Sequence, residues 1–223
     1  MDEVGEICVF NPGVMVGETY TEADKNKGLF ADGKHLRTGD LGRIDADGYI
    51  WITGRAKDLI IRGGHNIDPA MIEEALAGHP AVGFVGAIGQ PDAVAGEMPC
   101  AYVELIAGAS ASVEDLMAFA EENVSERAAV PKYLEVLYEL PKTAVGKVFK
   151  PDLRRMAITR VYNAALEAAG CTAGEVDAIV TVSSTGIATP SLEARVAGAM
   201  GFRTDVARIP VFGLGCAGGA AGL

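Results

Sequence analysis

The chain has 223 residues and a formal net charge of −11, enough length for one or two domains with a buried core. Its negative charge excludes nucleic acid as a partner, because phosphates would be repelled. The four cysteines (Cys8, Cys100, Cys171 and Cys216) include no Cys-x-x-Cys pair, so no metal site is expected and a reducing cytoplasm is the expected location. Cys8 and Cys100 lie in apolar runs and are expected to be buried.

Residues 1–53 are predicted to form a β-rich strip. The acidic start, Met1 to Glu6, lacks the basic residues and apolar stretch of a signal peptide. A strand is expected over residues 5–10, ended by the turn signal at residues 11–13. Residues 41–53 predict a β-hairpin with its turn at residues 45–48.

Residues 54–170 mix strands and helices without strict alternation, which predicts a small α+β domain. The apolar pattern indicates strands over residues 59–61, 82–88, 101–106 and 133–137, with a loop over residues 62–66. Helices are expected over residues 69–76, 112–125 and 152–169. Pro69 suits a first helical turn and Ser112 suits an N-cap.

The pattern changes after Gly170, so residues 171–223 form a third segment. A buried strand is expected over residues 176–182, a loop over 183–186, a helix over 190–200 and a second buried strand over 209–214. A further helix is expected to start at Cys216. This order suits a parallel sheet covered on both faces. The apolar tail of residues 209–223 is short and contains five glycines, so it is expected to be core rather than a membrane span.

Three side chains far apart in sequence suit the activation of a carboxylic acid by ATP. That reaction brings a carboxylate to the α-phosphate, so it needs cations at the meeting oxyanions and an acceptor that fixes the ribose. Asp40, which follows Thr38 and Gly39, is a natural acceptor for ribose hydroxyls. Arg55 can face phosphate, and Lys147 lies beside Gly146 in a segment expected to be a mobile loop.

The order and spacing of these residues resemble the C-terminal part of an acyl-CoA synthetase of the adenylate-forming, AMP-binding superfamily. The similarity covers residues 3–170 and is carried by the segments at residues 37–40, 54–73 and 141–150. It implies that Asp40 holds both ribose hydroxyls and that Arg55 reaches ribose and phosphate. Lys57 takes the position of the hinge between an adenylate-forming and a thioester-forming pose. Asn66 stands where some members have a phosphate-binding arginine.

The same resemblance implies roles for the remaining site residues and for the cofactors. Gly63 and Gly64 would line the channel for the pantetheine arm of coenzyme A, where a thiol must pass backbone without side chains. Lys147 would bridge the carboxylate and the α-phosphate in the first pose only. ATP, coenzyme A and Mg²⁺ are the implied cofactors, and a small carboxylic acid is the implied substrate.

The resemblance also implies an incomplete enzyme. Residues 1–53 correspond to the end of a larger N-terminal domain, and residues 54–170 correspond to the mobile C-terminal domain. The phosphate loop and acyl pocket of that larger domain are not in this sequence. A partial AMP-forming acid–CoA ligase, inactive alone, is therefore the first interpretation.

The segment of residues 171–223 resembles a different family, the type III polyketide synthases of the thiolase fold. The resemblance is carried by residues 180–192 and 208–219, and it makes Cys216 the acyl-loading nucleophile at a helix N-terminus. The segment would be an incomplete thiolase-like α/β fragment. Two alternatives to the ligase therefore stay open: an acyltransferase that uses Cys216, and a non-catalytic remnant or mis-joined reading frame.

Overall fold

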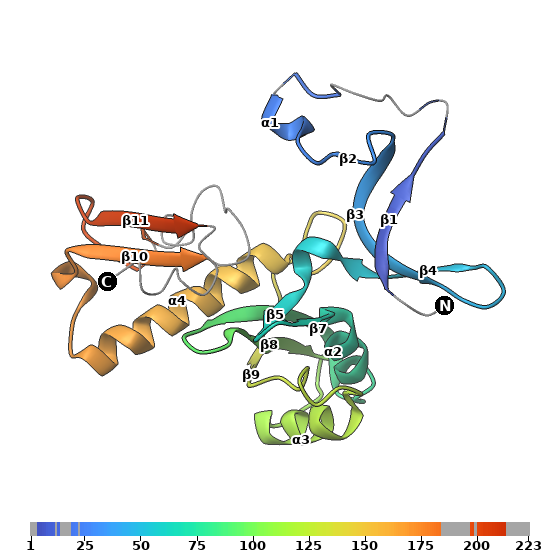
Figure 1. The fold of residues 1–223 in the computed structure, drawn as a ribbon. Helices are drawn as coiled ribbons and strands as arrows, with labels where there is room; N and C mark the ends of the chain where they lie inside the picture. The colour runs from blue at the N-terminus through green and yellow to red at the C-terminus, as the bar shows by residue number, and fades with distance from the viewer. Residues whose placement is uncertain are drawn as a thin grey trace.

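The computed structural model describes residues 4–11, 13, 19–21, 23–183, 197–198 and 200–212. Within these residues the chain forms three sheets in sequence order (Figure 1). An antiparallel N-terminal sheet is followed by a mixed sheet flanked by helices, and a pair of parallel strands comes last. None of the helices in this described part combines the length and apolar character that a bilayer crossing demands.

The N-terminal sheet is built around one long strand. Its elements are β1 (Gly5–Val9), α1 (Ala23–Asn26), β2 (Phe30–Ala31), β3 (His35–Ile44) and β4 (Ile50–Arg55). The hairpin expected over residues 41–53 is present as β3 and β4, but β3 begins six residues earlier. Its extra residues pair with β1 and β2. These partners lie elsewhere in the sequence, so no local sequence pattern predicts the pairing. The hairpin turn closes because the Asp45 carboxylate accepts the backbone N–H of Asp47 and of Tyr49.

A second sheet forms the core of the middle of the chain. A single turn of 3₁₀-helix, η1 (Ala56–Asp58), leads into it from β4. Its strands are β5 (Ile60–Arg62), β6 (His65–Ile67), β7 (Val82–Asp92), β8 (Gly96–Leu105) and β9 (Tyr133–Leu137). The order is β6-β5-β8-β7, and β9 pairs with β8 in parallel. The helices are α2 (Pro69–Ala77), α3 (Val113–Asn123) and α4 (Lys150–Ala169).

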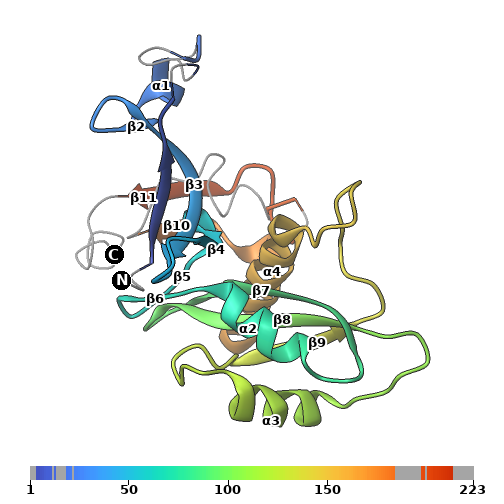
Figure 2. The same cartoon turned by 90° about the vertical axis from the view of Figure 1, so that its right-hand side faces the viewer.

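Helices cover both faces of this sheet, as Figure 2 shows for α4 on one side and for α2 and α3 on the other. Successive side chains of β8 point to opposite faces. Ala101 and Val103 pack in the larger core cluster with α2 and α3. Cys100 and Tyr102 pack in the second cluster with Leu153 of α4. The expected α+β domain is therefore a sheet between two helical layers.

Close packing of α4 depends on a glycine in β7. A Cβ atom on Gly86 would lie 2.5 Å from Cδ1 of Leu153 and 2.9 Å from Cγ1 of Val148. No side chain fits there without displacing α4 or the segment before it. Gly86 thus lets the helix that follows Lys147 lie directly against the sheet.

The last part of the chain contains a parallel pair of strands. After α4 ends at Gly170, which has a positive φ of 65°, η2 (Ala173–Glu175) leads to β10 (Ala178–Ser183). This strand pairs in parallel with β11 (Ala207–Phe212), as expected for the two strands predicted after residue 170. The helix expected over residues 190–200 lies mostly outside the described residues, and so does the helix start expected at Cys216.

Candidate functional site

Asp40 and Arg55 lie directly opposite each other on β3 and β4. Nε of Arg55 lies 2.9 Å from Oδ1 of Asp40, with the two side chains 55% and 30% exposed. The hydroxyl of Thr38 accepts the backbone N–H of Asp40 and donates to the carbonyl of Ile7. The structure therefore brings two of the predicted site residues together on adjacent strands of the N-terminal sheet, where both side chains are partly exposed.

Glu6 on β1 holds the same segment in place, and no sequence pattern predicts this role. Its carboxylate accepts Nη1–H of Arg37 at 3.0 Å and the backbone N–H of Gly39 at 3.2 Å. Gly39 has a positive φ of 75°, so the backbone turns just before Asp40. These hydrogen bonds join residues more than thirty positions apart, so they leave no periodic pattern in the sequence. The role of Glu6 becomes visible only from the pairing of β1 with β3.

Lys57 lies exposed in η1, the single turn that joins the two large sheets. An arginine of α4 holds this turn. Nη2 of Arg154 lies 3.0 Å from Oδ1 of Asp58 and donates to the carbonyl of Lys57 at 3.5 Å. Residue 58 is thereby tied to the helical layer of the second sheet, whereas Arg55 belongs to the first sheet.

Gly63 and Gly64 form the turn between β5 and β6. Their φ angles are +54° and +91°, which is the two-residue hairpin geometry that glycine adopts without strain. The loop expected over residues 62–66 is therefore a tight turn, with Arg62 and His65 paired as its flanks. The turn is exposed, and the Gly63 N–H donates to the carbonyl of Ala95. Asn66 lies exposed on β6, opposite Ile61.

A second unpredicted carboxylate lies beneath this turn. Oε2 of Glu97 accepts the backbone N–H of Ile61 at 2.8 Å, and a Cβ on Gly89 would meet that oxygen at 2.6 Å. Burial raises the pKa of Glu97, although the Ile61 bond and the nearby Arg154 charge oppose the shift. Glu97 thus supports β5 where that strand enters the glycine turn.

Lys147 lies exposed in residues 141–149, between β9 and α4. The segment is predicted to be a mobile loop, and the structure shows this loop closed as a hairpin; its mobility stays a prediction. The Thr143 N–H donates to the carbonyl of Lys147 at 2.7 Å, and the Lys147 N–H donates to Oγ1 of Thr143 at 3.2 Å. Gly146 supplies the positive φ of 78° that the turn needs.

The structure does not bring Lys147 to Asp40 and Arg55. Within the described ranges its ammonium makes no ion pair, whereas Arg55 is paired with Asp40. Figure 2 shows the segment between β9 and α4 extending away from β3 and β4. In this arrangement the candidate site is thus divided between two bodies that meet at η1.

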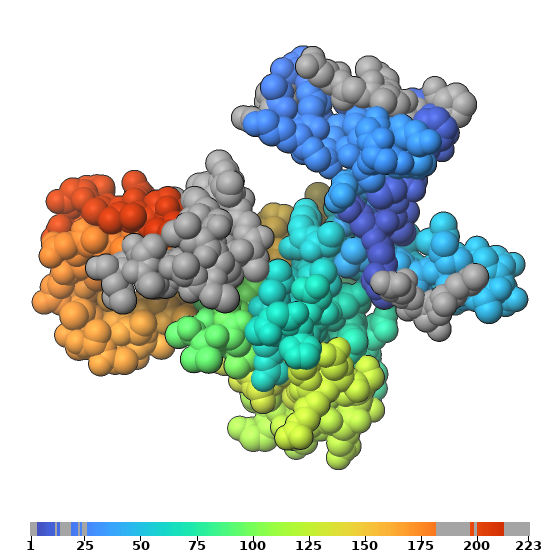
Figure 3. All heavy atoms as spheres, viewed as in Figure 1, coloured from blue at the N-terminus to red at the C-terminus, as the bar shows by residue number. Residues whose placement is uncertain are grey.

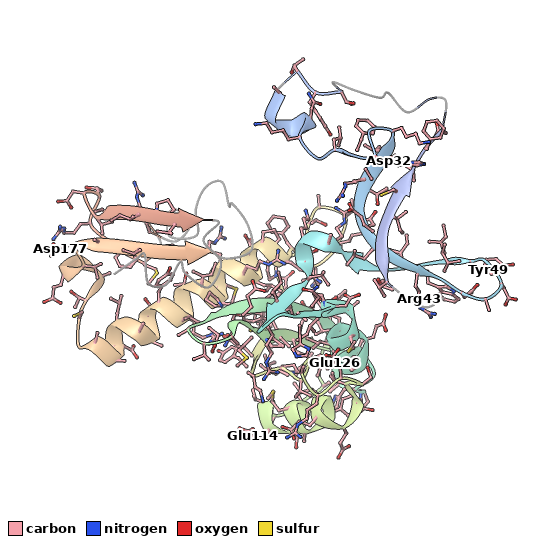
Figure 4. The ribbon with its side chains drawn as sticks, in the orientation of Figure 1. Asp32, Arg43, Tyr49, Glu114, Glu126 and Asp177 are labelled. Atoms are coloured by element: carbon pink, nitrogen blue, oxygen red, sulfur yellow. The ribbon has the colours of Figure 1, made fainter. Side chains whose placement is uncertain are left out.

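The β3–β4 hairpin exposes several large apolar side chains. Figure 3 shows much of the N-terminal sheet projecting beyond the helical layers, and Figure 4 shows Arg43 and Tyr49 projecting from the hairpin. Five residues, each more than half exposed, form what we call the apolar strip: Ile44, Tyr49, Ile50, Trp51 and Ile52. Because successive strand residues point to opposite faces, these exposed apolar side chains are shared between the two faces of the hairpin.

The cysteines divide into exposed and buried ones. Cys100 is fully buried as expected, and this burial raises the pKa of its thiol from 9.0 to about 11. The expectation that Cys8 is buried is wrong: its strand, β1, lies in the thin N-terminal sheet and the thiol is exposed. Cys171 is also exposed. Cys216 lies outside the described residues, so its role as a nucleophile stays a prediction.

Alkylation by iodoacetamide at neutral pH is expected to modify Cys8 and Cys171 at least about 100-fold faster than Cys100. A pKa raised by about two units leaves Cys100 about 100-fold less thiolate, and burial blocks the reagent as well. Peptide mass spectrometry of a time course measures the rates, and urea-unfolded chain is the control in which all sites should react. Rapid modification of Cys100 in the folded chain would contradict the packing of β8 against α4.

Metal binding has no ready site in the part of the chain that the structure describes. No group of three or more histidine, cysteine, aspartate or glutamate side chains converges there. The carboxylates named above are each occupied by a backbone N–H or a basic side chain.

Comparison with known proteins gives a consistent result. Residues 71–147 match the family described as AMP-binding enzyme C-terminal domain. The chain is 46% identical over 167 residues to marinolic acid–CoA ligase of Pseudoalteromonas sp. (strain SANK 73390), covering 75% of this chain and 25% of that protein. It is 43% identical over 151 residues to long-chain-fatty-acid–CoA ligase of Bacillus subtilis (strain 168), covering 68% of this chain and 26% of that protein.

Solved structures agree. ATP-bound MatB from Rhodopseudomonas palustris superposes with a TM-score of 0.63 at 34% identity, over 70% of this chain and 30% of the other. O-succinylbenzoate coenzyme A synthetase from Bacillus subtilis, in complex with AMP, superposes with a TM-score of 0.58 at 36% identity, over 69% and 30%. The chain thus spans about a quarter of the length of these curated relatives.

Proposed function

We propose that this chain, which carries a match to the C-terminal domain of AMP-binding enzymes and resembles AMP-forming CoA ligases, is part of an AMP-forming acid–CoA ligase. The reaction is carboxylic acid, ATP and coenzyme A giving acyl-CoA, AMP and pyrophosphate. We place it in the cytoplasm, on a small carboxylic acid. The observation that carries the proposal is the Asp40–Arg55 pair, held immediately before the hinge position at Lys57.

In the first half-reaction, the substrate carboxylate attacks the α-phosphate and pyrophosphate leaves. Asp40 accepts hydrogen bonds from the ribose hydroxyls and so fixes the nucleotide. Nε of Arg55 pairs with the Asp40 carboxylate. The N–H groups on its two terminal nitrogens suit ribose and phosphate oxygens. Asn66, exposed on β6, is a further donor for phosphate. The ammonium of Lys147 balances the negative charge that gathers between the carboxylate and the α-phosphate.

The separation of Lys147 from Asp40 and Arg55 supports a cycle with two poses. Because Arg154 ties Asp58 to α4, residue 58 moves with the second sheet. A rotation of the second sheet relative to the first must therefore occur about backbone bonds that precede residue 58. Lys57 and its neighbours in η1 are the short, exposed connection that remains. One pose brings Lys147 to the nucleotide, and the other brings the Gly63–Gly64 turn to the adenylate.

The residues present fit the implied cofactors. The Gly63–Gly64 turn is exposed and carries no side chains, so a pantetheine arm could pass it closely. Coenzyme A supplies the thiol that takes the acyl group, and Mg²⁺ accompanies the phosphates of ATP. The phosphate loop and the acyl pocket would come from the part of the ligase that is not in this chain.

A separate proposal concerns residues 171–223, which we infer to be a thiolase-like fragment of a type III polyketide synthase with Cys216 as acyl acceptor. The parallel pairing of β10 with β11 supports a sheet of that class. The alternative is a mis-joined reading frame that yields a non-catalytic remnant. DNA reads across codons 160–180 decide between a true fusion and an artefact: uniform coverage in one frame supports the fusion.

The ligase proposal is tested by joining residues 1–170 to the N-terminal part of the 46% identical relative and measuring ATP–pyrophosphate exchange. We expect exchange in the fusion, and a loss of about 10- to 100-fold in kcat/KM for ATP in Asp40→Ala, because charged hydrogen bonds to the ribose are removed. Asp47→Ala, an exposed carboxylate on the same hairpin, is the matched control. Full exchange by Asp40→Ala would exclude the assigned site.

A further inference from the structure

We propose that Glu104 is a positioning residue for Lys147, acting through Lys142. The proposal rests on the function proposed above, because it concerns how the adenylating lysine is presented. We name residues 141–149 the lysine hairpin. The inference is that two ion pairs clamp the ends of this hairpin to the sheet, so that Lys147 moves with the domain as a rigid projection.

The first clamp lies at the start of the hairpin. Glu104 is the penultimate residue of β8, and its Oε2 accepts the Leu140 N–H at 2.7 Å and Nζ–H of Lys142 at 2.6 Å. The side chains of Glu104 and Lys142 are only 15% and 20% exposed. Nζ of Lys142 also lies 4.3 Å from the centroid of the Phe84 ring, a favourable cation–π distance.

The ionised state of this clamp is favoured. Burial by itself would raise the pKa of Glu104, but the hydrogen bonds from Lys142 and Leu140 outweigh it and lower the pKa. The carboxylate is therefore charged at neutral pH. A charged, mostly buried pair with two donors on one oxygen is a stronger link than an exposed surface pair.

The second clamp lies at the end of the hairpin. Nζ of Lys150, the first residue of α4, lies 2.9 Å from Oε1 of Glu73 on α2, with both side chains mostly buried. The same oxygen accepts the Ala87 N–H of β7 at 2.8 Å. The exit from the hairpin is thereby fixed to a helix and a strand at once.

Backbone bonds close the hairpin between the two clamps. The Phe149 N–H donates to the carbonyl of Pro141 at 2.7 Å, and the Gly146 N–H donates to the carbonyl of Thr143 at 2.9 Å. Together with the bonds between Thr143 and Lys147, they fix the backbone of the lysine. A group held in place before the reaction loses less entropy in the transition state than a group on a loose loop.

The clamp also separates two lysines that are close in sequence. Lys142 is held inward by Glu104 and Phe84, whereas Lys147 is exposed. Only Lys147 is therefore free to enter the nucleotide site when the domain rotates. Loss of Glu104 would both loosen the hairpin and release a competing ammonium.

The first test uses the 223-residue chain as it is, with amide hydrogen exchange followed by NMR. Glu104→Ala is expected to accelerate exchange of the Thr143 and Phe149 amides by about 10- to 100-fold, since it removes a charged hydrogen bond from the clamp. The amides of α3 should keep their rates. Glu139→Ala, an exposed carboxylate nearby, is the matched control and should change neither set.

A second variant keeps the test decisive if Glu104→Ala loosens the whole domain. Lys142→Met keeps an unbranched apolar side chain of similar length and removes the ammonium with its charge and hydrogen-bond donors, so local acceleration at Thr143 and Phe149 supports the clamp. Lys142→Arg should restore the slow rates. Unchanged exchange at both amides in Lys142→Met overturns the proposal.

The second test uses the ligase fusion. Glu104→Ala should slow adenylate formation about tenfold and leave thioester formation from supplied acyl-adenylate within about twofold, because Lys147 serves only the first step. Equal losses in both steps would overturn a positioning role. Full activity of Lys147→Ala would instead defeat the proposed function, while the exchange results would still report on the clamp.

Discussion

Replacing Lys147 with alanine in the ligase fusion is expected to slow adenylate formation by about 100- to 1,000-fold. In the proposed function the ammonium is the group that meets both the carboxylate and the α-phosphate, and removal of one such electrostatic stabiliser costs about that factor. Thioester formation from supplied acyl-adenylate should be unchanged, since the proposed thioester-forming pose carries Lys147 away from the nucleotide. Single-turnover assays of the two half-reactions measure this split.

The matched control is Lys132→Ala. Lys132 is exposed, and its backbone N–H donates to the carbonyl of Pro99, a bond that the substitution leaves intact. Both half-reactions should therefore proceed at the unmodified rate. An equal loss of both half-reactions in Lys147→Ala would show that the lysine supports the fold of the hairpin rather than the chemistry.

Leu153→Ala is expected to lower the free energy of unfolding by about 2–5 kcal/mol, the usual loss for a buried leucine that leaves a cavity. Leu153 is fully buried and packs with Ile88, Tyr102 and Leu140 in the cluster between the sheet and α4. Its Cδ1 occupies the space over Gly86. Urea unfolding followed by far-ultraviolet circular dichroism gives the value.

Val94→Ala serves as the control, because Val94 is almost fully exposed and should change stability by less than about 0.5 kcal/mol. A loss below about 1 kcal/mol for Leu153→Ala would mean that α4 is not held against β7 and β8 in solution. In that case the second clamp of the lysine hairpin, the Lys150–Glu73 ion pair at the start of α4, would also be weakened.

Elements with local signals could be predicted from the sequence. Pro69 and Ser112 mark the starts of α2 and α3 to within one residue, because Asp68 caps the first helix and Ser112 forms a capping box with Asp115 in the second. The length of β3 could not be predicted in this way. Its first six residues are held by β1 and β2, which lie elsewhere along the chain.

The candidate site was predictable only where its residues belong to contiguous motifs. Asp40 and Arg55 sit on the two arms of one hairpin, so their meeting follows from the pairing of β3 with β4. Glu6, Glu97 and Glu104 act on partners more than thirty residues away. A single carboxylate in a strand carries no pattern that distinguishes it from a solvated one, so tertiary structure is needed to find it.

Trp51 is the single tryptophan of the chain. Its indole N–H donates to Oδ2 of Asp45 at 2.6 Å within the β3–β4 hairpin, and its side chain lies in the apolar strip, outside the core clusters around α2, α3 and α4. Intrinsic fluorescence excited at the indole band therefore senses whatever covers this edge of the N-terminal sheet, and is nearly blind to melting of the helical layers. Trp51 fluorescence would therefore report directly on any surface that the larger ligase proposed above brings against this hairpin.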